Sequence, residues 1–131
     1  MIVSLEEAVT VLDKWKDDAA TVLIMGQRSF REGLWAVDEG DVDWNMTLRA
    51  KVSGVSVSEG TYSTKRGVVL FETEGGELSL AMDACAFSYE ENCGIPEFVR
   101  ARGIRAQSCP SCLFIFLPSN EVFVIYELGR V

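Results

Sequence analysis

The feature that most restricts the fold of this chain is an alternation of apolar and polar residues between positions 42 and 57. From Val42 to Val52 every second residue is apolar, and the residues between them are polar or charged. This period of two indicates an antiparallel strand with one buried face and one wet face. At Gly54 the phase shifts by one residue, and Val55 and Val57 become the apolar positions. Such a shift exchanges the two faces, so we expect a bulge or sharp bend and a sheet that curls there.

The residues before this strand predict a helix near the N-terminus. Ser4 and Glu7 have the spacing of a capping box, in which each side chain accepts a hydrogen bond from the backbone N–H of the other residue. The apolar residues recur at steps of three and four: Leu5, Ala8, Val9, Leu12, Trp15 and Ala19. We expect the helix to end near Asp17 and Asp18, because two acids there oppose the helix dipole and are poor helix formers.

Most of the remaining chain predicts short strands joined by turns. Candidate strands cover residues 21–25, 34–37, 68–73, 78–82, 112–117 and 122–128, and Gly26 is expected to end the first of them. The pair Gly75–Gly76 predicts a hairpin turn, and residues 97–107 are a candidate short helix. Short connections favour antiparallel neighbours. The sequence therefore predicts one α+β domain over residues 1–131. Its N-terminal helix packs on a strongly curled, mostly antiparallel sheet, or partly open barrel, of about seven strands.

Composition narrows the classes of function. The chain has no histidine, which removes the commonest general base and metal ligand and excludes Ser-His-Asp and Cys-His catalysis. The formal net charge of −8 disfavours nucleic acid as a partner, because phosphates carry the same sign. We find no basic signal region and no apolar run long enough to span a membrane. We therefore expect a cytoplasmic protein whose four cysteines are free thiols.

Cys109 and Cys112 form a C-x-x-C pattern that has three interpretations. Two thiolates across a tight turn fit a zinc knuckle, in which Cys85 and Cys93 would complete the four ligands. A redox couple would need a helix that lowers the thiol pKa, whereas this motif precedes the strand-like residues 113–117. In the third interpretation the motif is a turn whose reduced cysteines act as small apolar residues.

Basic residues near position 100 form a second candidate site. Arg100, Arg102 and Arg105 together could bind a small anion such as a phosphate or a carboxylate. The segment carries no glycine-rich phosphate loop, so ordinary surface charge is the alternative.

The last predicted hairpin is apolar on both sides. Phe114 and Phe116 alternate with the apolar residues 113, 115 and 117, so neither side of this strand is polar. We expect the helix or a second subunit to cover one of the two faces. The sequence therefore predicts a homo-oligomer interface formed by Phe114, Phe116, Phe123 and Tyr126.

Together these features favour a non-enzymatic interaction or oligomerisation module of the cytoplasm, with no catalytic residues and no cofactor. Its expected partner is a second copy or another protein. The alternative is a thiol or structural-zinc protein built on Cys109 and Cys112. A third hypothesis is a small-anion-binding regulator.

Overall fold

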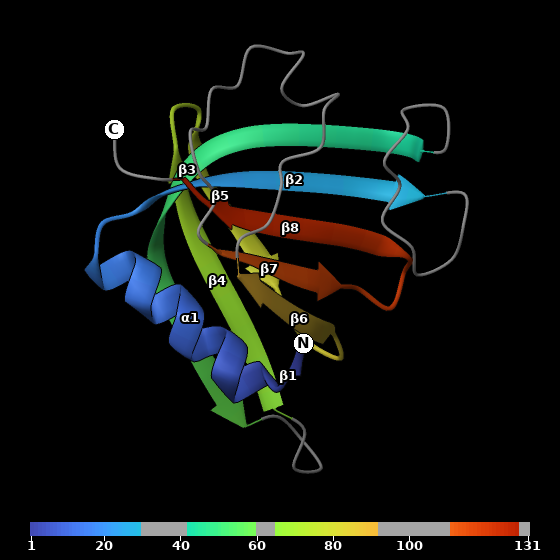
Figure 1. Ribbon diagram of the computed structural model, residues 1–131, viewed down its shortest axis with the longest axis horizontal. Coiled ribbons are helices and arrows are strands. Elements are labelled where there is room, and N and C mark those ends of the chain that lie inside the picture. Colours follow the sequence, from blue (N-terminus) through green and yellow to red (C-terminus); the bar gives the residue numbers. More distant parts are fainter. Residues whose placement is uncertain (30–41, 60–64, 92–110, 129–131) are drawn as a thin grey trace.

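The computed structural model describes residues 1–29, 42–59, 65–91 and 111–128, which form one helix and one antiparallel sheet (Figure 1). The elements are β1 (Ile2–Val3), α1 (Leu5–Asp17), β2 (Thr21–Ser29), β3 (Val42–Glu59), β4 (Lys65–Thr73), β5 (Gly76–Ala81), β6 (Ala86–Glu91), β7 (Ser111–Phe116) and β8 (Glu121–Glu127). The eight strands lie in the order β1-β6-β7-β8-β2-β3-β4-β5, and the sheet does not close into a barrel. The predicted α+β class with a curled, open sheet is confirmed, and the described residues form eight strands where about seven were predicted for the whole chain. The strand predicted at 34–37 and the helix predicted at 97–107 lie outside the described residues.

Helix α1 begins and ends where the sequence predicts. The hydroxyl of Ser4 accepts a hydrogen bond from the N–H of Glu7 at 3.1 Å, and the Glu7 carboxylate accepts one from the N–H of Ser4 at 3.2 Å. Asp18 caps the other end. The capping box therefore fixes the first turn, and the helix buries Ala8, Leu12 and Trp15 against the sheet.

Strand β3 bends at the predicted glycine and belongs to two parts of the sheet (Figure 1). Its residues 42–51 pair with β2, and its residues 50–59 pair with β4. The register with β4 shifts between Val52 and Gly54, which marks a bulge. The bend brings the β4–β5 part over the other strands, so that Phe71 of β4 and Ile115 of β7 belong to one hydrophobic cluster.

Between residues 46 and 52, where the burial of β3 is described, its apolar face is buried at Ala50 and Val52, which belong to this cluster. Ala50 and Val52 each keep 5% of their surface exposed, whereas Leu48 on the same face is 37% exposed. The alternation in the sequence therefore identifies the inward face but overestimates how much of it is covered.

The inner face of the sheet and α1 enclose the main core. Its fully buried members come from α1, β2, β4, β7 and β8 and include Leu12, Val22, Val69, Phe71, Leu113 and Ile125. A second cluster lies on the opposite, outer face of β2, β7 and β8: Leu23, Met25, Cys112, Val122, Val124, Tyr126 and Leu128. These three strands are buried on both faces, which explains their nearly continuous apolar sequences.

Two glycines of the sheet have different roles. Gly26 does not end β2, contrary to the prediction, because the strand continues to Ser29. It lies opposite Phe123, and a Cβ atom at position 26 would come within 2.6 Å of the phenylalanine ring. The ring thus fills the space of a missing side chain. Gly76, in contrast, follows the hairpin turn predicted there, pairs with Thr73 and has a φ of 125°, a conformation that favours glycine.

Candidate functional site

The described residues include two of the four cysteines, and these two differ. Cys112 lies fully buried in the outer cluster and is disulfide-bonded, which corrects the expectation of a free thiol at this position. A disulfide sulfur is not a thiolate, so Cys112 cannot bind zinc in this state. Cys93 and Cys109 lie outside the described residues. In the part of the chain that is described, no three potential ligands converge on a metal site, and the four-cysteine zinc site stays a prediction.

Cys85 is a half-buried free thiol in the connection between β5 and β6. Its Sγ donates a hydrogen bond to the backbone carbonyl of Asp83 at 3.6 Å. Burial, and secondly the Asp83 carboxylate, raise the pKa of the Cys85 thiol to about 11. A reactive cysteine needs a lowered pKa, so the surroundings of Cys85 oppose a nucleophilic or redox role for this thiol.

The predicted anion site also lies outside the described residues. Arg100, Arg102 and Arg105 belong to the segment between β6 and β7, and the anion-binding hypothesis stays a prediction.

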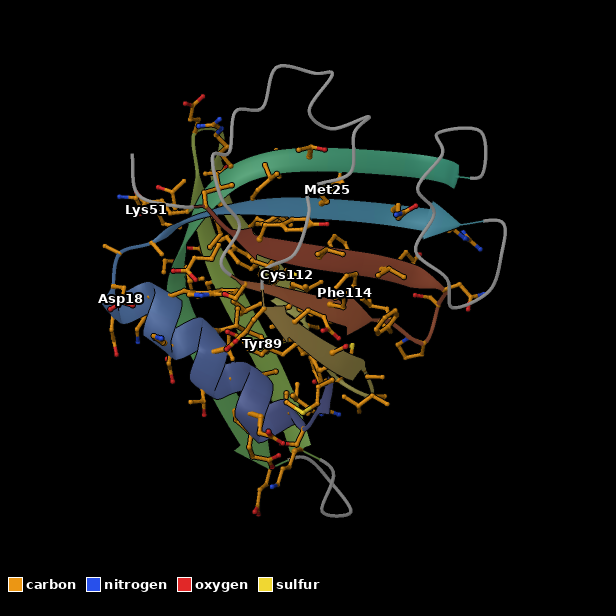
Figure 2. The ribbon with its side chains drawn as sticks, viewed as in Figure 1. Asp18, Met25, Lys51, Tyr89, Cys112 and Phe114 are labelled. Carbon is orange, nitrogen blue, oxygen red and sulfur yellow. The ribbon has the colours of Figure 1, made fainter. Side chains whose placement is uncertain are left out.

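The four aromatic residues predicted for an interface do not share one surface. Phe123 lies on the inner face beside the main core. Tyr126 is only 2% exposed and belongs to the outer cluster. Phe114, which is labelled in Figure 2, lies partly buried on the outer face of β7. Phe116 lies on the same face, and the two rings are stacked at a centroid distance of 6.1 Å. The predicted interface of these four residues stays a prediction, and Phe114 and Phe116 are the two that are partly buried on the same face.

Two apolar residues at the β1 end of the sheet lie on the same face as these rings, with the hydroxyl of Ser88 between Ile2 and Phe114. Ile2 lies opposite Ser88, which lies opposite Phe114, and Ala86 lies opposite Phe116. Directly opposite residues of antiparallel strands share a face, so Ile2 and Ala86 are on the outer face with the rings. Ile2 is 86% exposed. We call Ile2, Ala86, Phe114 and Phe116 the outer apolar patch.

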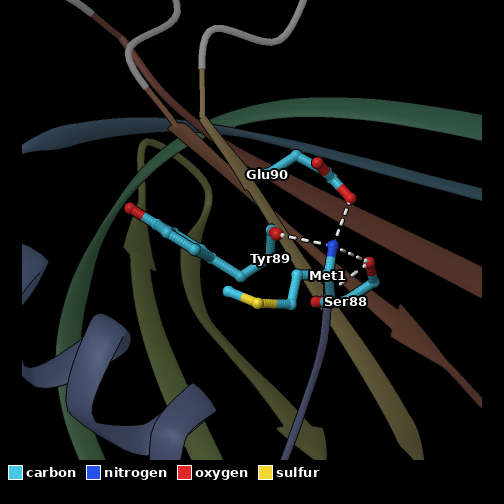
Figure 3. Close-up of polar contacts among 4 residues, drawn as sticks. All are labelled: Met1, Ser88, Tyr89 and Glu90. Atoms are coloured by element: carbon cyan, nitrogen blue, oxygen red, sulfur yellow. Dashed lines mark hydrogen bonds and ion pairs between the residues drawn. The ribbon is translucent and has the colours of Figure 1, made fainter.

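A charged group beside the patch is neutralised by an ion pair (Figure 3). The N-terminal ammonium of Met1 pairs with the carboxylate of Glu90 on β6. It also donates hydrogen bonds to the carbonyl oxygen of Tyr89 at 3.1 Å and to the hydroxyl of Ser88 at 3.4 Å. The hydrogen bond from the ammonium lowers the pKa of the Glu90 carboxyl. This carboxylate therefore adds little net charge at the border of the patch.

The other end of the sheet is an open edge at β5. Among the described strands β5 pairs only with β4, and their register is unbroken from Val68–Ala81 to Thr73–Gly76. The side chains of Leu78 and Leu80 are half-buried against the main core, whereas those of Glu77 and Ser79 are exposed. An edge strand presents unpaired backbone N–H and C=O groups to solvent. The edge is therefore a second candidate contact site, which the sequence analysis did not identify.

Known proteins offer no template for either site. No protein-family model matches the chain, and no curated protein and no solved structure matches it significantly. Among the described helical residues, none form a helix that is both long and apolar enough to cross a membrane.

Proposed function

We propose that this protein is a non-enzymatic interaction module that associates through the outer apolar patch, with a second copy of the chain as its leading partner. The observation that carries this proposal is the alignment of Ile2, which is 86% exposed, with the stacked rings of Phe114 and Phe116. Single exposed apolar residues are common on protein surfaces, whereas several on one face, here with only Ser88 between Ile2 and Phe114, favour a contact site.

The charge distribution supports association at this patch. Two copies of a chain with a net charge of −8 repel each other, so their contact surface should add few like charges. The patch itself is uncharged, and the neighbouring carboxylate of Glu90 is paired with the N-terminal ammonium. A two-fold dimer would place the same patch of both copies face to face.

The test is the mass of the assembly in solution. We expect sedimentation and native mass spectrometry to show an oligomer for the wild type and a monomer for Ile2→Lys. Since Ile2 is so exposed, this substitution should leave the fold intact. The matched control is Val57→Lys, which introduces the same charge at a site that is 41% exposed on β3. A monomeric wild type, or an Ile2→Lys protein that stays oligomeric, would rule out the patch.

The cellular compartment belongs to this proposal. The sequence favours the cytoplasm, where structural disulfides are rare, whereas Cys112 is disulfide-bonded. An alkylating reagent added during lysis traps free thiols, and mass spectrometry of the Cys112 peptide then distinguishes a reducing cytoplasm from an oxidising compartment. An alkylated Cys112 agrees with a reducing cytoplasm, and an unmodified one argues for an oxidising compartment.

A second candidate function is that of a thiol or zinc protein, and zinc binding requires that the Cys112 disulfide be reduced first. In a reduced protein Cys112 would be available again, together with Cys85, Cys93 and Cys109 as the proposed ligands. One equivalent of zinc bound by the fully reduced protein would favour this function, and a metal-free reduced protein with four titratable thiols would remove it.

A further inference from the structure

Among the described residues, the edge of β5 has few of the features that usually protect an edge strand, and Glu77 is the one charged side chain of the strand. Such edges are commonly blocked by proline, by lysine, by a bulge or by making the strand very short. Strand β5 has six residues, none of which is proline or lysine. Its pairing with β4 shows no register shift. As far as the described strands extend, one side of β5 is free to pair with a further strand.

The side chains of β5 specify what such a strand would need on each face. Leu78 and Leu80 lie at the margin of the main core, on the inner face. Apolar residues opposite them on an added strand would extend this core by one layer. Glu77 and Ser79 lie on the exposed outer face, where an added strand should place polar residues opposite them.

Glu77 adds a preference for positive charge. Lys51 of β3 lies opposite Glu72 of β4, and Glu72 lies opposite Glu77 of β5, so the three form one row across the sheet. Two carboxylates directly opposite each other destabilise a strand pair. A lysine or arginine on the next strand would place a positive charge beside Glu77, whereas a carboxylate would extend the repulsion.

We propose that the edge of β5 binds an extended basic segment of another protein as an added antiparallel strand. This segment has apolar residues opposite Leu78 and Leu80 and a lysine or arginine opposite Glu77. Backbone hydrogen bonds hold the segment, and the alternating side chains select it. A second copy is a poor occupant of this edge, because β5 contains no basic residue to face Glu77 and both copies carry a charge of −8.

The experiment uses short synthetic peptides as probes. In an antiparallel register the peptide Thr-Val-Thr-Val-Lys-Thr places valines opposite Leu80 and Leu78 and its lysine opposite Glu77. We expect it to bind the full chain saturably in a fluorescence anisotropy titration at low salt. A version with N-methyl groups on alternate amides, which cannot pair as a strand on the methylated side, should not bind.

Charge reversal tests the position of the lysine. Glu77→Lys should weaken binding of the lysine peptide by roughly threefold to tenfold, and it should bind a peptide with glutamate in place of lysine more tightly than the wild type does. The matched control is Glu74→Lys, which makes the same charge change in the β4–β5 turn outside the row. It should weaken binding much less. An unchanged or higher melting temperature of Glu77→Lys confirms that the fold is retained.

Several results would overturn the proposal. These are no binding at millimolar peptide, equal binding of the N-methylated peptide, or equal losses in the Glu74→Lys and Glu77→Lys proteins. A wild-type dimer that Glu77→Lys disrupts would assign the edge to a second copy instead. Ile2→Lys should bind the peptide like the wild type, so failure at this edge and failure of the outer apolar patch are distinguishable.

Discussion

The two ends of the sheet meet solvent in opposite ways. At the β1 end the last strand has two residues, and the exposed feature is an apolar face bordered by a neutralised carboxylate. At the β5 end the last strand has six residues, and the exposed feature is a backbone edge bordered by Glu72 and Glu77. Burial of an apolar face is not directional, whereas strand pairing fixes direction and register. One sheet therefore offers two surfaces that suit different partners.

Local sequence signals explain why the two ends differ. Strand β1 stops after Val3 because Ser4 already caps helix α1, so the chain leaves the sheet at once. Strand β5 begins at Gly76, directly after a two-residue turn, and its pairing with β4 continues to Ala81. A capping box thus shortens one edge, and a hairpin lengthens the other.

The largest expected effect separates core aromatic residues from those of the patch. Phe71 is fully buried in the β4–β5 part of the core, and Phe71→Ala should lower the free energy of unfolding by roughly 3–5 kcal/mol. Phe114 is only partly buried, so Phe114→Ala should cost about 1–2 kcal/mol. Urea denaturation at low protein concentration measures both losses. Equal losses would mean that Phe114 is a core residue and that the β1 end has no free apolar surface.

The sequence predicts those structural features of the two ends that depend on residues close together along the chain. The capping box at Ser4, the bulge at Gly54 and the hairpin at Gly76 are all local signals, and all three are present. The prediction that β2 ends at Gly26 is wrong. A glycine is needed there because the ring of Phe123, almost a hundred positions further along the chain, fills the space of a side chain.

The candidate sites could be predicted less well, because they depend on strand order. The pairing of β1 with β6 places Ile2 in one cross-strand row with Phe114, and the sequence near either residue does not predict this pairing. The pairing of β6 with β1 and β7 leaves β5 at an edge, although the sequence of β5 is compatible with an interior strand. Alternation of apolar residues also could not separate Phe123 from Phe114, which face opposite sides of the sheet.

The connection between β5 and β6 contains the free thiol of Cys85. The pKa of Cys85 in this connection is about 11 instead of the ordinary 9.0, so the thiolate fraction at neutral pH should be about a hundredfold lower. We expect iodoacetamide to modify Cys85 slowly at pH 8 and at half its maximal rate near pH 11, as read from the mass of the Cys85 peptide. The thiol should react at the ordinary rate in urea.

Asp83→Asn separates the two causes of this raised pKa. Burial is the larger cause, so removing the carboxylate should lower the pKa of Cys85 only in part. A Cys85 that reacts at pH 8 in the native protein as fast as in urea would show that the β5–β6 connection opens readily.

The smallest expected effect is the pH dependence of two exposed ion pairs, one at the β1 end and one between α1 and β4. The terminal ammonium lowers the pKa of Glu90, and a hydrogen bond from Lys65 lowers the pKa of Glu6 below the ordinary 4.5. Both carboxylates therefore contribute stability that is present above pH 4.5 and is lost as the pH falls through their lowered pKa values. Lys65 has a raised pKa, so its contribution is present below pH 10.5 and is lost as the pH rises through that raised value.

Melting curves of the wild type, Glu90→Gln and Glu6→Gln between pH 3 and pH 7 measure these contributions. Each variant should melt slightly below the wild type at pH 7 and converge with it at pH 3, and salt should reduce the difference because both pairs are exposed. The two variants should differ in association. Glu90→Gln leaves an unpaired ammonium beside the outer apolar patch, so it should weaken self-association but not peptide binding at β5. Glu6→Gln should change neither, and a loss of self-association in Glu6→Gln would show that the patch responds to general stability rather than to its own charge.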